Sequence, residues 1–219
     1  MKQQAKMVAG ETWTLMFKET GIEKWDEQLD EDEMTDPENN LVRLILYIYS
    51  LDSFLFSAVD YALKSGDMSK TSTLGPYAKI LGSALRSASE RRKDLVPFGP
   101  PFKVSLYRGG LLSEPQIEEY RKIVDKKDFV QLIGHVSATS NKETALEHIL
   151  DKKLEGGLKP VLFHLIRWDS PKCYYVVDQS PFPYEQEVLL HDGVRLFVLA
   201  MDEKEEERKM YTVITLKNW

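Results

Sequence analysis

Apolar residues recur at helical spacing in the first part of the chain and at strand spacing in the second. Positions three or four residues apart form one face of a helix, and before residue 97 they include Leu41, Leu44, Ile45, Ile48, Leu51 and Leu55. The same spacing predicts a helix over residues 76–93, and a weaker pattern predicts another over residues 12–24. Residues 96–101, Val-Pro-Phe-Gly-Pro-Pro, interrupt this periodicity and predict a connector.

After the connector, short alternating segments predict strands separated by two helices. The predicted strands cover residues 102–107, 129–136, 161–168, 174–178, 187–190, 195–200 and 210–216. One predicted helix covers residues 115–126 and has Pro115 in its first turn. The other covers residues 141–153, with Ser140 as the N-cap of a capping box. The charged residues 202–209 are predicted to form an exposed hairpin connection.

Helices followed by strands predict an α+β fold. We expect an N-terminal helical region over residues 1–96 and a strand-rich core over residues 97–219, together forming one compact unit. The total of 219 residues suits a single domain, or one domain with an added lobe.

Composition excludes several classes of protein. The net charge of −6 argues against a surface built to wrap nucleic acid, which needs a basic face. The longest apolar stretch, residues 44–59, contains Asp52 and is too short for a membrane span, so we expect a soluble protein. Cys173 is the only cysteine, and its apolar and aromatic neighbours favour a structural residue over a reactive thiol. We expect a monomer.

Two groups of polar residues lie where predicted strands end. Arg108 follows the first strand and precedes Gly109 and Gly110, and a guanidinium there can hold a phosphate or a carboxylate. Ser137 and Thr139 are two positions apart, so on an extended strand their hydroxyls face the same side. Taken singly, each group is explained more simply as surface and turn chemistry.

A third group, Glu185 and Glu187, enters the apolar segment Val188-Leu189-Leu190. Carboxylates two positions apart on a strand project from one face. Two such charges repel unless cationic or hydroxyl partners stabilise them. Paired carboxylates also suit the cleavage of a glycosidic bond, whose transition state is oxocarbenium-like. An exposed strand start is again the simpler explanation for this pair alone.

Taken together and in order, the three groups resemble the arginine–serine–glutamate class of mono-ADP-ribosyltransferases, which includes bacterial toxins and vertebrate ecto-enzymes. The resemblance covers about residues 102–200 and extends to the segments 137–146, 161–165, 178–180 and 184–190. It implies N-terminal helices packed on a two-sheet β-sandwich. The family commonly has Ser-Thr-Ser, whereas residues 137–139 are Ser-Ala-Thr. An alternative register ends at Ser140, but it puts alanine in the leading place.

The resemblance implies a site that takes NAD as substrate and needs no metal. The implied NAD-binding residues are Tyr107, Arg108, Gly109, Ser137, Thr139 and Glu187. Among these, Arg108 would bind a phosphate, and Gly109 would meet the nicotinamide amide through its backbone. Ser137 would orient Glu187, Thr139 would brace the strand, and Glu187 would stabilise the cationic ribose as nicotinamide leaves.

The resemblance also implies a protein acceptor. Glu185 would contact or activate the acceptor side chain, and Phe182 and Tyr184 would contact the acceptor protein. A glutamate in the place of Glu185 accompanies arginine acceptors in the family, so arginine is favoured. The implied catalytic residues are therefore Arg108, Ser137, Glu185 and Glu187. The protein would act in its own cytoplasm, or as an exported effector in the cytosol of a target cell.

Other functions have weaker support in the sequence. No Gly-x-Gly-x-x-Gly segment or phosphate-loop motif is present, which disfavours a hydride-transfer dehydrogenase. The four histidines lack the spacing of metal ligands. Two alternatives stay open, because both keep the same residues or the same fold. One is NAD glycohydrolysis with water as the acceptor, and the other is a binding module without catalysis.

Overall fold

A computed structural model describes residues 45, 46, 49, 54–66, 68–91, 104–150, 156–168, 174–176, 183–206 and 208–218. By their internal contacts the residues form two compact units, Met1–Ala84 and Leu85–Trp219. The predicted helix over residues 12–24 lies outside the described residues, and the division into residues 1–96 and 97–219 stays a prediction.

The first unit is helical where it is described. Its elements are α4 (Phe54–Ser65), the 3-10 helix η3 (Met68–Lys70) and most of α5 (Thr71–Arg91), whose last residues pass the division between the units. Ile45, Leu46 and Tyr49 are also helical, and all three are buried. The helix predicted from residue 76 therefore begins five residues earlier, with Pro76 inside it.

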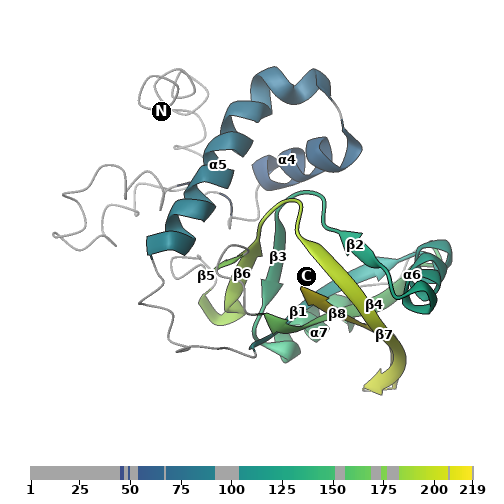
Figure 1. Cartoon of the computed structure of the whole chain (residues 1–219). Coiled ribbons are helices and arrows are strands. Elements are labelled where there is room, and N and C mark those ends of the chain that lie inside the picture. The colour runs from purple at the N-terminus through teal and green to yellow at the C-terminus, as the bar shows by residue number, and fades with distance from the viewer. Residues whose placement is uncertain are drawn as a thin grey trace. The chain divides into compact units, whose positions relative to one another are not determined.

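The second unit contains one mixed sheet of eight strands in the order β2-β7-β8-β4-β1-β3-β6-β5 (Figure 1). The strands are β1 (Val104–Leu112), β2 (Phe129–Gln131), β3 (Val136–Thr139), β4 (Lys159–Trp168), β5 (Tyr174–Val176), β6 (Glu187–Leu190), β7 (Arg195–Glu206) and β8 (Lys209–Asn218). Strands β4 and β8 pair in parallel, and the other pairs are antiparallel. The α+β class is confirmed. The expected division into two sheets is not confirmed, because the hydrogen-bonded strand order is continuous.

Two helices cover opposite faces of this sheet. Successive side chains of a strand point to opposite faces, and on β1 Leu106 joins one apolar cluster while Tyr107 packs against the other. Helix α6 (Glu114–Lys126) contributes Ile117 to the Leu106 cluster. Helix α7 (Lys142–Leu150) contributes Ala145, Leu146 and Ile149 to the Tyr107 cluster. The sheet is therefore buried on both sides in this region.

The prediction for α6 is confirmed, including a proline in its first turn. Its N-terminus is capped by Ser113, whose backbone N–H donates to Oε1 of Gln116 at 2.9 Å. At its other end, Lys127 adopts a left-handed conformation with φ 53°, and its N–H donates to the carbonyl of Val124. These contacts satisfy backbone groups that a helix end leaves without partners.

The region predicted as one strand over residues 129–136 forms two strands instead. Gly134 has φ 83°, a conformation that breaks an extended chain, and it lies between β2 and β3. Strand β2 then pairs with β7, whereas β3 pairs with β1 and β6. The sequence pattern missed this change of partner because apolar residues continue through the break.

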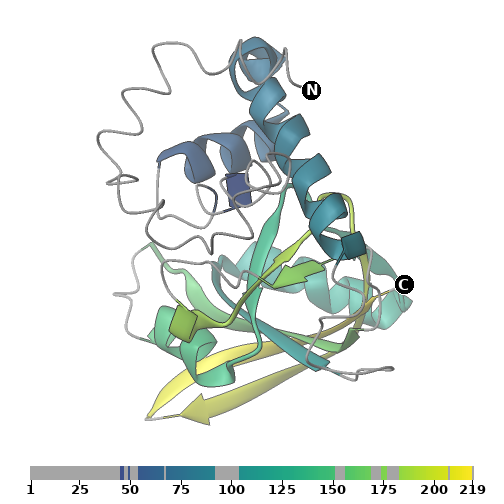
Figure 2. The same ribbon diagram turned by 90° about the vertical axis from the view of Figure 1, so that its left-hand side faces the viewer.

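The charged residues 202–209 were predicted to form an exposed hairpin connection, but residues 202–206 belong to β7 and Lys209 belongs to β8. The two strands form a long hairpin that is visible as the yellow ribbon in Figure 2, with Glu206 opposite Lys209. Arg208 has φ 65° and supplies the left-handed residue that a tight turn needs. Cross-strand hydrogen bonds do not depend on side-chain polarity, so a charged strand forms where its partner strand is present.

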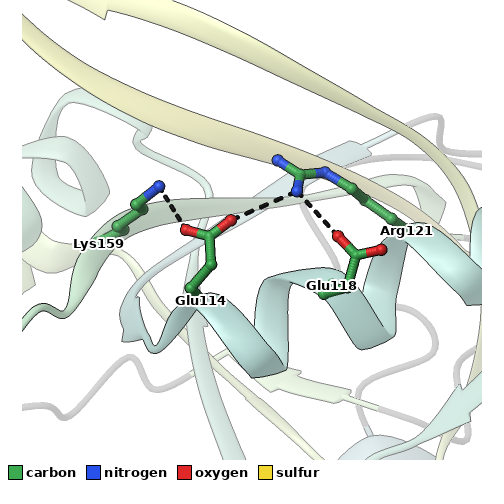
Figure 3. A network of polar contacts seen from close by, with 4 residues as sticks. All are labelled: Glu114, Glu118, Arg121 and Lys159. Carbon is green, nitrogen blue, oxygen red and sulfur yellow. Dashed lines mark hydrogen bonds and ion pairs between the residues drawn. The ribbon is translucent and has the colours of Figure 1, made fainter.

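An exposed ion-pair network joins the start of α6 to the start of β4 (Figure 3). Glu114 pairs with Lys159 and with Arg121, and Arg121 also pairs with Glu118 at 3.0 Å. The hydrogen bond from Lys159 is the main cause that holds the pKa of Glu114 below its usual value. Because these side chains are solvated, we expect the network to add little stability.

None of the described helices combines the length and the hydropathy that a membrane span requires.

Candidate active site

Strand β1 carries Arg108 in its interior and not at its end. The sequence predicted that the strand stops before Gly109 and Gly110, but the ladder continues to Leu112. Gly109 pairs with Leu162 and Gly110 with Val161 on β4. The neighbouring strand therefore overrides the weak strand preference of glycine.

Gly109 is required by the packing of α7. A Cβ atom at this position would overlap the carbonyl oxygen of Ala145 and would lie 2.7 Å from Cγ2 of Ile149. The backbone of β1 thus approaches the backbone of α7 more closely than any side chain allows. This contact sets the distance between the strand that carries Arg108 and the helix that follows Thr139.

Tyr107 and Arg108 are adjacent on β1 and contact different neighbours. The Tyr107 ring stacks on the His164 ring with 4.9 Å between their centroids and 10° between their planes. Nε2 of His164 lies 3.0 Å from Oγ of Ser105. Arg108 is half-buried, and its Nη1 donates to the carbonyl oxygen of Ser137 at 2.6 Å. The arginine is therefore held against β3.

Three neighbouring strands bring Arg108, Ser137 and Glu187 together. Strand β3 lies between β1 and β6 in the sheet. Tyr107 is opposite Thr139 across β1 and β3, and Thr139 is opposite Glu187 across β3 and β6. Ser137 lies two residues before Thr139 and so projects from the same face as Thr139 and Glu187. The Ser137 hydroxyl donates a hydrogen bond to the Glu187 carboxylate.

Glu185 does not lie on the same strand as Glu187, contrary to the prediction. It ends the 3-10 helix η4 (Pro183–Glu185), and β6 begins at Glu187. Gln186 between them has φ 47°, so the backbone turns at this residue. Oγ1 of Thr139 donates to the Glu185 carbonyl at 2.5 Å, which ties the turn to the end of β3. The two carboxylates still come close enough for the charge of Glu185 to act on Glu187.

The sequence predicted Ser140 as the N-cap of the helix after β3, but Asn141 caps it. Oδ1 of Asn141 accepts from the N–H groups of Glu143 and Thr144, at 3.0 and 3.4 Å. Oγ of Ser140 is engaged elsewhere, because it donates to Oε1 of Gln186 at 2.6 Å. The capping-box spacing was present in the sequence, but a cross-strand partner competes for the serine hydroxyl.

Glu187 is the most strongly perturbed acid of the site. Its pKa is raised from 4.5 to about 7, mainly by burial and also by the negative charge of Glu185. The hydrogen bond from Ser137 and the positive charge of Arg108 both lower it, but they do not offset the loss of water. Only 9% of the residue is exposed. A carboxyl group in this state becomes fully charged when a cation enters beside it.

This pKa predicts a pH-dependent effect of Glu187 on folding. Between pH 4.5 and about 7 the folded protein holds the proton more tightly than the unfolded chain, so stability falls as pH rises through this window. The Glu187→Gln variant lacks this loss. The free energy of unfolding of this variant, relative to that of the wild-type protein, should therefore rise by up to about 3 kcal/mol between pH 4 and pH 8, as measured by urea unfolding.

The control for this measurement is Glu119→Gln, at an exposed acid on α6. Because this side chain is exposed, its replacement should change the free energy of unfolding little. A difference between Glu187→Gln and the wild-type protein that does not vary with pH would show that the folded-state pKa of Glu187 is not raised.

The structure describes only some of the remaining residues that the sequence analysis singled out. Tyr184 lies on η4 with 68% of its surface exposed, while Phe182 and Cys173 lie outside the described residues. In the part of the chain that the structure describes, no group of three or more His, Cys, Asp or Glu residues is placed to hold a metal ion. The prediction missed Asn141, which caps α7, and His148, whose Nε2 lies 3.8 Å from Oε1 of Glu185. Their separation of seven residues, two helical turns, was the available signal.

No family model and no curated protein matches the sequence. Solved structures do match. The ADP-ribosyltransferase HopU1 of Pseudomonas syringae pv. Tomato aligns over 86% of this chain and 80% of its own, with a TM-score of 0.59 and 16% identity. The ADP-ribosyltransferase Vis of Vibrio splendidus, in a complex with agmatine, aligns over 88% and 87%, with a TM-score of 0.55 and 16% identity.

C3stau2 from S. aureus, in a structure with NAD, aligns over 82% of this chain and 87% of its own. Its TM-score is 0.55 and its identity 17%. At these identities the likeness concerns the fold. The chain has the fold of mono-ADP-ribosyltransferase toxins, as its motifs had predicted.

Proposed function

We propose that this protein is an NAD-dependent mono-ADP-ribosyltransferase that transfers ADP-ribose to a protein side chain and releases nicotinamide. The observation that carries the proposal is the convergence of Arg108, Ser137 and Glu187 from three adjacent strands, with Glu185 beside them. The fold shared with ADP-ribosyltransferases supports it.

The buried carboxylate of Glu187 suits the cleavage of the nicotinamide–ribose bond. When this bond breaks, its electron pair moves onto the nicotinamide ring, and positive charge develops on the ribose. Glu187 stabilises that charge more in the transition state than in the ground state, which is the binding that raises a rate. Because Glu187 is buried, this attraction is stronger than it would be in solution.

Arg108 and Ser137 prepare the site for this step. Arg108 binds a phosphate of NAD through its guanidinium group, which the Ser137 carbonyl holds against β3. Ser137 orients Glu187 through its hydroxyl hydrogen bond, and Thr139 holds the neighbouring turn through the Glu185 carbonyl. Tyr107 and Gly109 line the same part of β1.

Glu185 is placed to receive the acceptor. It lies on η4, beside exposed Tyr184 and outside the buried strand that holds Glu187. A carboxylate attracts a guanidinium group and can take a proton from it, so we favour arginine as the acceptor residue. Vis binds agmatine, an arginine analogue, in the same fold. The structural neighbours that are named toxins favour a toxin or effector that modifies a protein in the cytosol where it acts.

Incubation with NAD labelled in its adenine ring tests the proposed function. We expect label on protein in a lysate and equimolar release of nicotinamide, and mass spectrometry should place the ADP-ribose on arginine. Label on another residue would remove the preference for arginine. Nicotinamide release without labelled protein would select NAD glycohydrolysis. Failure to bind NAD at millimolar concentration would point to a module without catalysis.

A further inference from the structure

Helix α7 carries a histidine that lies beside the acceptor-side glutamate. Nε2 of His148 is 3.8 Å from Oε1 of Glu185. The His148 side chain is 56% exposed, and the Glu185 side chain is 26% exposed. The pair therefore lies at the mouth of the site, between solvent and the buried carboxyl of Glu187.

Hydrogen bonds around Thr139 connect the segments that carry this pair. Thr139 Oγ1 donates to the Glu185 carbonyl, and the same oxygen accepts from the N–H of Asn141 at 2.9 Å. Asn141 then caps α7 through its side chain. His148 comes seven residues later, two helical turns on, and so lies along the same edge of α7. Glu185 and His148 are thus positioned by one group of hydrogen bonds.

The opposite face of α7 fixes which way His148 points. Ala145 and Ile149 are buried against the sheet, and Gly109 allows the close approach of the helix there. A rotation of α7 that moved His148 away from η4 would withdraw these residues from the core. His148 is therefore held near Glu185 even though its own ring is largely solvated.

We propose that His148 is a positioning residue that acts through Glu185: it orients the Glu185 carboxylate toward an acceptor guanidinium and then takes the proton that Glu185 removes. The inference rests on the proposed function. The distance of 3.8 Å is longer than a hydrogen bond. A small movement of either side chain closes it, as is common when a substrate completes a site.

The bond between ribose C1′ and the nicotinamide nitrogen breaks, and its electron pair stays with neutral nicotinamide. A guanidino nitrogen of the acceptor forms a bond to C1′ and loses one proton to Glu185. Nε2 of His148 accepts that proton from Glu185 and passes it to water. Glu185 is restored as a carboxylate for the next acceptor.

Other charged groups near Glu185 make such a partner useful. Glu187 on β6 is buried and interacts with the charge of Glu185, and Arg108 on β1 offsets part of that repulsion. Glu147, next to His148 on α7, is exposed. Once His148 has taken the proton from Glu185, its positive charge beside Glu185 reduces the repulsion between the two site carboxylates. Water that attacks the ribose needs no such orientation, so His148 should matter for transfer and not for hydrolysis.

The test compares His148→Ala, His148→Gln and the matched control Glu147→Ala, each with NAD as donor and agmatine as acceptor. We expect His148→Ala to lower kcat for transfer about tenfold while NAD hydrolysis without acceptor stays within twofold. Glu147→Ala should leave both rates within twofold. His148→Gln can donate a hydrogen bond but cannot take the proton, so we expect a near-normal KM for agmatine with a low kcat.

Every other outcome overturns the inference, one of its steps, or the proposed function. Equal transfer by His148→Ala and the wild-type protein overturns the inference alone, and so does an equal loss of transfer and hydrolysis, which indicates a structural role. Full kcat in His148→Gln overturns the proton step. A wild-type protein that releases nicotinamide but modifies no agmatine overturns the guanidinium step. A wild-type protein with neither activity overturns the proposed function itself.

Discussion

Replacing Glu187 with glutamine is expected to lower ADP-ribosyl transfer from NAD between about a hundredfold and a thousandfold, with a similar loss of nicotinamide release. Glutamine has nearly the same shape and can still accept the hydrogen bond from Ser137. It has no negative charge to stabilise the cationic ribose. The rates should be measured at pH 8, where a carboxyl group with a pKa of about 7 is mostly charged.

The Glu187→Gln variant should remain folded, because it removes an acid whose charged form is disfavoured by burial. Circular dichroism and urea unfolding would verify this in the same preparation. Glu119→Gln, on the surface of α6, is the matched control and should keep full activity. Retention of more than a tenth of wild-type activity by folded Glu187→Gln would refute a catalytic role for this carboxylate.

The second large effect is expected on stability, from Gly109→Ala. In a strand, alanine instead of glycine ordinarily gains about 0.5–1 kcal/mol. At Gly109 the added Cβ meets the carbonyl oxygen of Ala145 and Cγ2 of Ile149, and the first of these is backbone. Helix α7 must move away from β1, so we expect a net loss of about 2 kcal/mol in the free energy of unfolding, measured by urea titration.

The neighbouring glycine is a matched control. At Gly110 an added Cβ lies 3.2 Å from Cε2 of Phe163, which belongs to a half-buried side chain that can shift. Gly110→Ala should therefore change stability by less than about 1 kcal/mol. If the two variants lost the same stability, the close contact between β1 and α7 would not be the reason for glycine at position 109.

Predictions from local periodicity held where neighbouring segments did not interfere. Helix α6 and strand β6 lie where the pattern put them, because the amphipathic face of α6 and the apolar run of β6 leave few alternatives. The extent of β1 and of the β7–β8 hairpin was underestimated. In both cases glycines or charges weaken the local preference, and a partner strand supplies the hydrogen bonds that extend the ladder.

Side-chain roles at the turn after β3 were harder to foresee. The spacing around Ser140 satisfied the rule for a capping box, yet Asn141 caps α7. The competing partner, Gln186, is 46 residues away in the chain. For the same reason the proximity of His148 to Glu185 had no local signal other than its two-turn spacing from Asn141.

By itself, the sequence determined the α+β order of elements, the residue types of the candidate site and their order along the chain. These follow from apolar periodicity and from motifs, which are local properties. Only the tertiary structure decided that Arg108, Ser137 and Glu187 meet on adjacent strands, and that Glu185 stands on a separate turn. It also decided that Glu187 is buried enough for a pKa of about 7. Burial and charge proximity depend on residues distant in the chain, so no local pattern contains them.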